Sequence, residues 1–149
     1  KNTPFKLQLD IEHDASMDSY PGALGQVITN FVSNAMQHGF EGRKAGLMRL
    51  QVFPEGSEHI RLEFSDDGIG MPDEVQQRVF DPFFTTKLGQ GGSGLGMNIV
   101  YNIVRDVLGG HITINSGMGL GTCITVVMPI TAPQGQSASP DAPLHPAAP

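Results

Sequence analysis

Three polar side chains with the spacing of a binding surface occur in a segment that carries no charge. No Asp, Glu, Lys or Arg occurs between Asp18 and Glu41, although the exposed side of a helix usually carries charged residues. Asn30, Asn34 and His38 follow one another at intervals of four, so on a helix they lie along one strip. Neutral oxygen donors suit Mg²⁺, which keeps several waters and takes phosphate oxygens as further ligands. The spacing alone also allows another interpretation, in which the amides pack against neighbouring loops.

An acidic turn follows one of the apolar strand patterns. Asp66 and Asp67 are followed by Gly68 and Gly70 within the sequence SDDGIGMP. The glycines let the backbone bend tightly and let a flat ligand approach, and a carboxylate can accept a hydrogen bond from that ligand. A simple Asp-Gly turn without a ligand is the alternative that the sequence leaves open.

A glycine-rich stretch precedes a second helical pattern. Residues 89–96 contain five glycines in eight positions and lead into a helix, whose free N–H groups can receive phosphates. Lys87 adds a positive charge nearby. The stretch has neither the Gly-Lys-Ser/Thr of a P-loop nor the spacing GxGxxG. A surface loop with no ligand is the alternative here.

The apolar spacing predicts the elements that must position these residues. Alternation predicts strands at Phe5 to Ile11, Leu47 to Phe53, His59 to Phe64, His111 to Asn115 and Thr122 to Met128. Spacing of three and four predicts helices from Pro21 to Gly39, Asp73 to about Val79 and Leu95 to Leu108. This order predicts an α+β fold, a two-layer sandwich with the helices on one face of a mixed, mostly antiparallel sheet.

Composition excludes several partners and sets the domain limits. The 149 residues include 9 basic and 15 acidic side chains and a net charge of −6, so we expect no nucleic acid and no direct membrane contact. The single cysteine, Cys123, fits a reducing cytoplasm, and the sequence contains neither a spanning helix nor a signal peptide. We expect one domain at residues 1–131 and a disordered Pro/Ala-rich tail or linker at 132–149. The chain opens with Lys1, from which we expect a longer parent with any membrane anchor upstream.

Taken together and in this order, the motifs resemble the ATP-binding catalytic domain of sensor histidine kinases, which shares a superfamily with gyrase-type, chaperone and mismatch-repair ATPases. The five matching boxes are the N box at Gln26 to Gly39, glycine boxes at Asp66 to Gly70, Gly92 to Gly96 and Gly119 to Thr122, and the F box at Phe80 to Phe84. The resemblance covers roughly residues 5–130. It implies the Bergerat fold, with about three helices over the sheet, and Mg-ATP as the ligand.

The resemblance also implies roles for individual residues. Asn34 would bind the Mg²⁺, with Asn30 and His38 assisting through water or phosphate contacts. Asp66 would accept a hydrogen bond from the adenine amino group. The implied base pocket also includes Gly68, Gly70, Met71 and Thr122. The implied phosphate-binding and lid residues are Phe84, Thr86, Lys87, Gly92, Ser93, Gly94, Leu95 and Gly96, and the loop from Thr85 to Ser93 would act as a mobile lid.

One position distinguishes branches of this superfamily. Water-activating members carry Glu four residues before the metal-binding Asn, where it serves as a general base, and this chain has Asn30 there. A neutral amide cannot accept that proton. The resemblance therefore favours phosphoryl transfer to an outside nucleophile, catalysed by positioning and charge neutralisation.

The implied acceptor is a histidine on a separate helical dimerisation domain, normally upstream, and a response regulator receiver domain takes the phosphoryl group onward. His13 with Asp14 superficially matches the acceptor motif, but it falls in a short turn after a strand and not on an amphipathic helix, so we do not expect it to be phosphorylated. We expect the chain itself to be monomeric, because dimerisation in the family uses the other domain. Two alternatives remain, an autonomous ATPase and a nucleotide-sensing or scaffold module that does not catalyse.

Overall fold

The computed structural model describes residues 4–12, 19–82 and 96–133. Some of the sequence predictions concern residues outside these ranges. They are His13, the tail from residue 134 onward, and the phosphate-binding and lid residues Phe84, Thr86, Lys87, Gly92, Ser93, Gly94 and Leu95.

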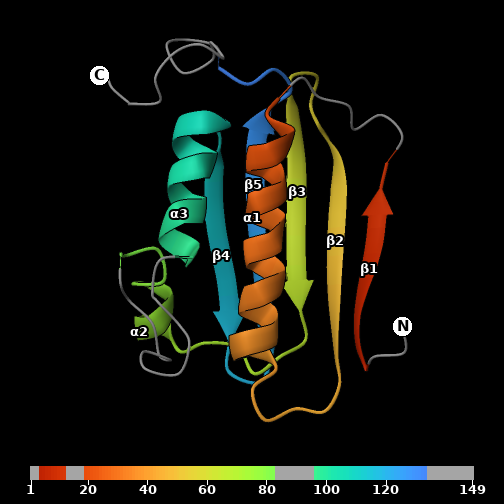
Figure 1. Cartoon of the computed structure of the whole chain (residues 1–149), viewed down its shortest axis with the longest axis vertical. Coiled ribbons are helices and arrows are strands. Elements are labelled where there is room, and N and C mark those ends of the chain that lie inside the picture. Colours follow the sequence, from red (N-terminus) through yellow and green to blue (C-terminus); the bar gives the residue numbers. More distant parts are fainter. Residues whose placement is uncertain (1–3, 13–18, 83–95, 134–149) are drawn as a thin grey trace.

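Five strands form one sheet in the order β1-β2-β3-β5-β4 (Figure 1). Their bounds are β1 Phe5–Ile11, β2 Gly46–Glu55, β3 His59–Asp66, β4 His111–Gly117 and β5 Gly121–Pro129. β1 runs parallel to β2, and all other neighbours are antiparallel. The predicted mixed, mostly antiparallel sheet is therefore confirmed.

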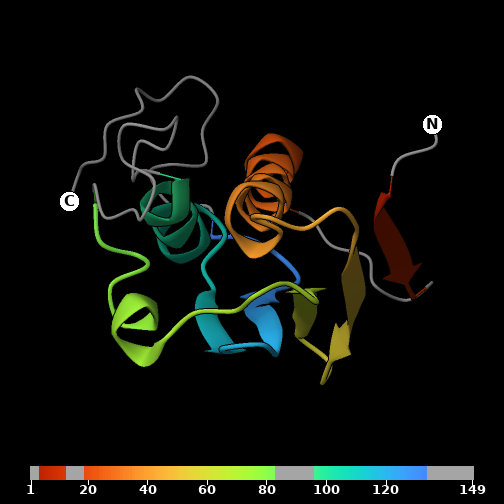
Figure 2. The same ribbon diagram turned by 90° about the horizontal axis from the view of Figure 1, so that it is seen from below.

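The helices are α1 Pro21–Asn34, α2 Asp73–Gln76 and α3 Gly96–Asn102. Figure 2 shows α1 and α3 on the same face of the sheet, as predicted for a two-layer sandwich. The short α2 lies beside the edge strand β4 instead of over the centre of the sheet (Figures 1 and 2). No helix within the described ranges has the length and apolar character needed to cross a membrane.

The helices end differently from the prediction. α1 gives way at Asn34 to a π-helical turn, Ala35–Gly39, in which the Phe40 N–H donates to the Ala35 carbonyl at 2.8 Å. The wide turn carries the Gly39 carbonyl to the Ile69 N–H, 2.8 Å away, so a tertiary contact overrides the local α-helical pattern.

A similar π-helical turn, Ile103–Val107, follows α3. The predicted extension of the short helix to Val79 was wrong, because α2 ends at Gln76. Its chain continues in tighter turns, with the Arg78 N–H donating to the carbonyl of Val75 at 3.0 Å. An isolated helical turn gains too few hydrogen bonds to propagate by itself.

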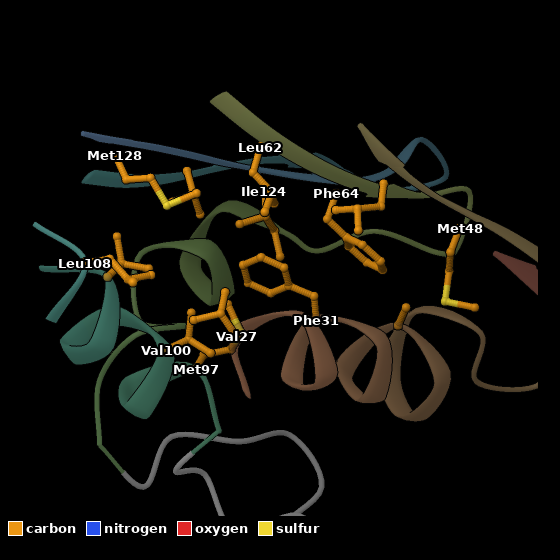
Figure 3. Close-up of a cluster of buried hydrophobic side chains, with 14 of the residues drawn as sticks. Val27, Phe31, Met48, Leu62, Phe64, Met97, Val100, Leu108, Ile124 and Met128 are labelled. Carbon is orange, nitrogen blue, oxygen red and sulfur yellow. The ribbon is translucent and has the colours of Figure 1, made fainter. Parts of the chain in front are cut away.

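The core lies between the two helices and the sheet (Figure 3). Phe31 of α1 is fully buried, and its ring centroid lies 5.6 Å from that of Phe64 on β3. The largest fully buried side chains are Phe31, Phe64, Ile60, Leu62, Leu108, Met128, Val27, Val100, Val104 and Val126. Burial of this apolar surface fixes α1 and α3 on the sheet.

Strand register brings two of the predicted site residues, Asp66 and Thr122, together. Asp66, the last residue of β3, pairs with Thr122 near the start of β5, so both stand at the same end of the sheet.

The residues after β5 also pack against the domain. Ala132 is buried, and the Tyr20 hydroxyl donates to the Pro133 carbonyl at 3.3 Å. The ordered packing thus extends through Pro133.

Candidate functional site

A pocket of about 410 Å³ opens beside α1, the end of β3 and the first residues of α3. This volume suits a small molecule or cofactor. Its polar lining residues are Asn30, Ser33, Asn34, Gln37, His38, Glu41, Asp66 and Thr122. Its other lining residues are Phe31, Ala35, Gly39, Phe64, Ile69, Gly70, Met71, Pro72, Val75, Val79, Gly96, Met97, Ile114, Met118 and Ile124.

The strip of Asn30, Asn34 and His38 lines this pocket, as its spacing predicted. The Asn30 Nδ2 atom is buried and has no hydrogen-bond partner among the described residues. The Asn30 Oδ1 atom lies near the start of α3. A Cβ atom added to Gly96, the first residue of α3, would be 3.9 Å from it. A buried donor without a partner is costly, so this amide is suited to an incoming acceptor.

Asp66 supplies a carboxylate to the opposite part of the lining. Its Oδ1 accepts a hydrogen bond of 2.8 Å from the Gly68 N–H. Burial raises the pKa of the Asp66 carboxyl above its ordinary value, and the negative charge of Asp67 adds to this. Backbone N–H groups of Gly68 and Thr122 pull the pKa back in part. A ligand that donates to this carboxylate would offset the cost of burying its charge.

The neighbouring Asp67 has a different, structural role. Its Oδ1 accepts from the Leu47 N–H at 2.9 Å, and its backbone carbonyl accepts from the Arg43 guanidinium at 2.6 Å. The Arg43 guanidinium also lies 3.6 Å from the Asp67 carboxylate. Asp67 therefore joins the start of β2 to the loop after α1, and it does not line the pocket.

Glycines allow three segments of backbone to meet beside the pocket. A Cβ at Gly68 would overlap the Gly39 carbonyl, and one at Gly70 would overlap the Gly117 carbonyl. Gly70 also has a φ of 78°, which favours glycine. Gly68 itself does not line the pocket. Its role is to let the backbone of Gly39 approach the loop after β3 closely.

Sequence reasoning missed much of the apolar wall. Phe64, Ile114 and Ile124 come from strands, where alternation marked them as core without indicating that they also face a cavity. Val75 and Val79 lie four residues apart just after the acidic motif. This spacing could have predicted that both side chains lie on the same side of a helical turn and face the pocket. Met118 lies just before the third glycine box and lines the pocket while 63% exposed.

Comparison with known proteins decides the family. The model of the histidine kinase-, DNA gyrase B- and HSP90-like ATPases matches residues 20–132. The chain belongs to this family. Membership in this family of ATPases implies that the domain binds ATP.

Two relatives illustrate the sequence similarity. The sensor histidine kinase AruS of Pseudomonas aeruginosa is 37% identical over 129 residues, which cover 77% of this chain and 12% of AruS. The sensor kinase CckA of Brucella abortus is 31% identical over 138 residues, covering 83% of this chain and 14% of CckA. The chain thus spans a small part of these multidomain relatives.

Solved structures support the fold of this ATP-binding domain. The catalytic domain of the histidine kinase ThkA matches with a TM-score of 0.72 and 24% identity, over 86% of this chain and 82% of that one. The mycobacterial sensor histidine kinase MprB matches with a TM-score of 0.70 and 23% identity, over 87% and 84%.

The backbone contact at Gly70 can be tested with a matched pair of glycines. Gly70→Ala adds a Cβ onto the Gly117 carbonyl at a positive φ, and we expect it to lower the free energy of unfolding by more than about 3 kcal/mol. Gly119 has a φ of 80° but open space around it, so Gly119→Ala should cost only about 1 kcal/mol. Denaturant unfolding measures both, and equal losses would contradict the close contact.

The raised pKa of Asp66 predicts a pH-dependent difference from Asp66→Asn. Because the folded-state pKa exceeds the unfolded one, the protonated carboxyl stabilises the fold at low pH, and this contribution is lost as pH rises through the folded pKa. Asp66→Asn should therefore gain stability relative to the wild type at pH 7, and the gain should shrink as pH falls through the raised pKa. Urea unfolding at a series of pH values measures this, and a gain that does not change with pH would refute it.

Proposed function

We propose that this domain binds Mg-ATP in the pocket and donates the γ-phosphoryl group to a histidine on a separate dimerisation domain of its parent protein. A response regulator receiver domain would then take the phosphoryl group onward. The observation that carries the proposal is the arrangement of Asn30, Asn34 and His38 with Asp66 around one pocket. The family of the chain and the sensor kinases among its relatives support it. We assign this chemistry to the cytoplasm, where ATP is available.

Asp66 accounts for recognition of the base. Its half-buried carboxylate is an acceptor, and the exocyclic amino group of adenine is a donor. Guanine has a carbonyl oxygen at the corresponding position, which the carboxylate would repel. Gly70, Met71 and Thr122 border the same part of the pocket, and the apolar wall suits a flat base. The proposed site is therefore selective for adenine.

The polar strip fits a magnesium ion held mainly by the nucleotide. No group of three or more His, Cys, Asp or Glu residues suited to a metal occurs within the described ranges. Mg²⁺ at this site would take the Asn34 oxygen, waters and phosphate oxygens as ligands. The buried, unpartnered Asn30 amide suits a donor to a phosphate oxygen or a metal-bound water. His38 lines the same pocket and would assist.

The phosphate-binding assignments follow from the family resemblance. Gly96 lines the pocket beside Asn30, and it supports a phosphate path toward the start of α3. The other proposed phosphate-binding and lid residues lie outside the described ranges. They are Phe84, Thr86, Lys87, Gly92, Ser93, Gly94 and Leu95.

Nucleotide binding is tested with a calorimetric titration of the chain with the ATP analogue AMPPNP, with and without Mg²⁺. We expect Asn34→Ala to weaken binding at least about tenfold when Mg²⁺ is present, because the metal loses its protein ligand, and to change it little without the metal. Thr29→Ala, an exposed position on the same helix, serves as the control and should match the wild type. Failure of the folded wild type to bind AMPPNP would overturn the proposed function.

The proposal also predicts phosphoryl transfer without hydrolysis. Asn30 cannot accept a proton from water, so the chain incubated with Mg-ATP should release phosphate at no more than the rate of the buffer. Addition of the dimerisation domain from the same parent should transfer label from γ-³²P ATP onto a histidine. Steady phosphate release by the chain alone would favour an autonomous ATPase. Binding of AMPPNP without any transfer to the acceptor would favour a nucleotide-sensing module.

A further inference from the structure

The side chain of Gln76 pairs with the free edge of the sheet as a neighbouring strand would. β4 is the last strand in the sheet, and among the described residues no other strand covers its outer edge. The Gln76 Nε2 donates to the Ser116 carbonyl at 2.8 Å, and the Ser116 N–H donates to the Gln76 Oε1 at 3.1 Å. One amide side chain thus satisfies both backbone groups of Ser116 on that edge.

The same pair of residues holds the backbone of Met71, which lines the pocket. The Met71 N–H donates to the Ser116 Oγ at 2.9 Å, and the Met71 carbonyl accepts from the Gln76 Nε2 at 3.3 Å. The Ser116 hydroxyl also lies 2.8 Å from both the Gly121 carbonyl and the Thr122 hydroxyl. The network therefore connects Met71 to Thr122, two residues of the proposed base pocket.

Side-chain contacts to neighbouring elements fix α2 and the residues that follow it. No residue of α2 is buried, so α2 has little core of its own. Beyond α2, the Asn98 Nδ2 donates to the Phe80 carbonyl at 2.9 Å, and the Phe80 and Tyr101 rings lie 5.4 Å apart. Contacts to β4 and α3 thus hold the segment from two sides. Within α2 itself, no buried residue would compensate for loss of the Gln76 contacts.

We propose that Gln76 is a positioning residue for the nucleotide base, acting through the backbone of Met71. This inference rests on the proposed function, because it assumes that the base lies against Met71 and Thr122. Gln76 lies outside the pocket lining and touches the edge of the sheet instead. Gln76 fixes the distance between Met71, in the loop after Asp66, and the β4–β5 hairpin, so that a flat base fits between them.

A change of one functional group tests the role. In Gln76→Glu the side chain keeps its shape, but an ionised carboxylate cannot donate to the carbonyls of Met71 and Ser116 and repels both oxygens. We expect Mg-AMPPNP to bind at least about tenfold more weakly than to the wild type at pH 8. At about pH 4 a glutamate with the ordinary pKa of about 4.3 is mostly protonated and regains a donor, so the ratio of the two affinities should fall below about threefold.

A matched variant removes the other effects of pH and charge. The next residue, Gln77, is exposed, and Gln77→Glu adds the same charge. This variant should bind Mg-AMPPNP within about twofold of the wild type at both pH values. The other ionisable groups on the surrounding segments are the same in all three proteins, so their effects on binding cancel from the ratios. These groups are Asp66, Asp67, Asp73, Glu74, Arg78, Asp81 and His111.

Hydrogen exchange without nucleotide tests the contact separately. The Ser116 amide donates to Gln76 and not across to β5, so Gln76→Leu should speed its exchange at least about tenfold, with the amides at the centre of β3 unchanged. Unaltered exchange at Ser116 would overturn the proposal. So would equal binding by Gln76→Glu and wild type at pH 8, or a loss of the same size at both pH values. Absence of binding by the folded wild type, with exchange altered as expected, would instead refute the proposed function and with it the base-positioning role.

Discussion

Direct contact between three stretches of backbone at one end of the sheet is the constraint on which the site depends. The Gly39 carbonyl accepts from the Ile69 N–H at 2.8 Å, and the Ile69 carbonyl accepts from the Gly119 N–H at 2.7 Å. This ladder joins the end of the first helical segment, the loop after β3 and the β4–β5 hairpin. Such close approach excludes side chains at Gly68 and Gly70, and it brings the polar strip and Asp66 to one pocket.

The same constraint gives two adjacent acids opposite environments. Successive residues at the end of a strand point to opposite sides, so Asp66 faces the pocket and Asp67 faces Arg43 and the start of β2. Burial raises the pKa of Asp66, and that energetic cost is acceptable where a ligand supplies a donor. Asp67 instead stabilises the loop that leads away from the first helix. The acidic motif therefore combines a carboxylate that faces the pocket with one that supports the structure.

Periodicity predicted the elements well because burial on one face of a strand or helix leaves a local pattern. Contacts between residues distant in sequence leave no such pattern, and they account for what was missed. The π-helical turn before Gly39 depends on Ile69, 30 residues later, and no local propensity indicates it. Gln76 is likewise an ordinary polar residue in sequence, because its partner Ser116 lies 40 residues away. The motifs located the polar strip and Asp66, but alternation could not show which core strand residues also face the pocket.

An acidic chain can bind ATP only if the field at the site differs from that of the whole surface. The net charge of −6 opposes a polyanion at long range, but salt screens exposed charges beyond about 8–10 Å. What matters locally is the helix face between Asp18 and Glu41, which carries no carboxylate and presents amides, among them that of Asn30, whose Nδ2 atom is buried. With the phosphates bound beside α1 as proposed, a Glu at position 30 would add a base for water and also a negative charge next to them. The neutral amide of Asn30 would supply neither, so in the proposed function one residue both favours transfer over hydrolysis and leaves room for the phosphates.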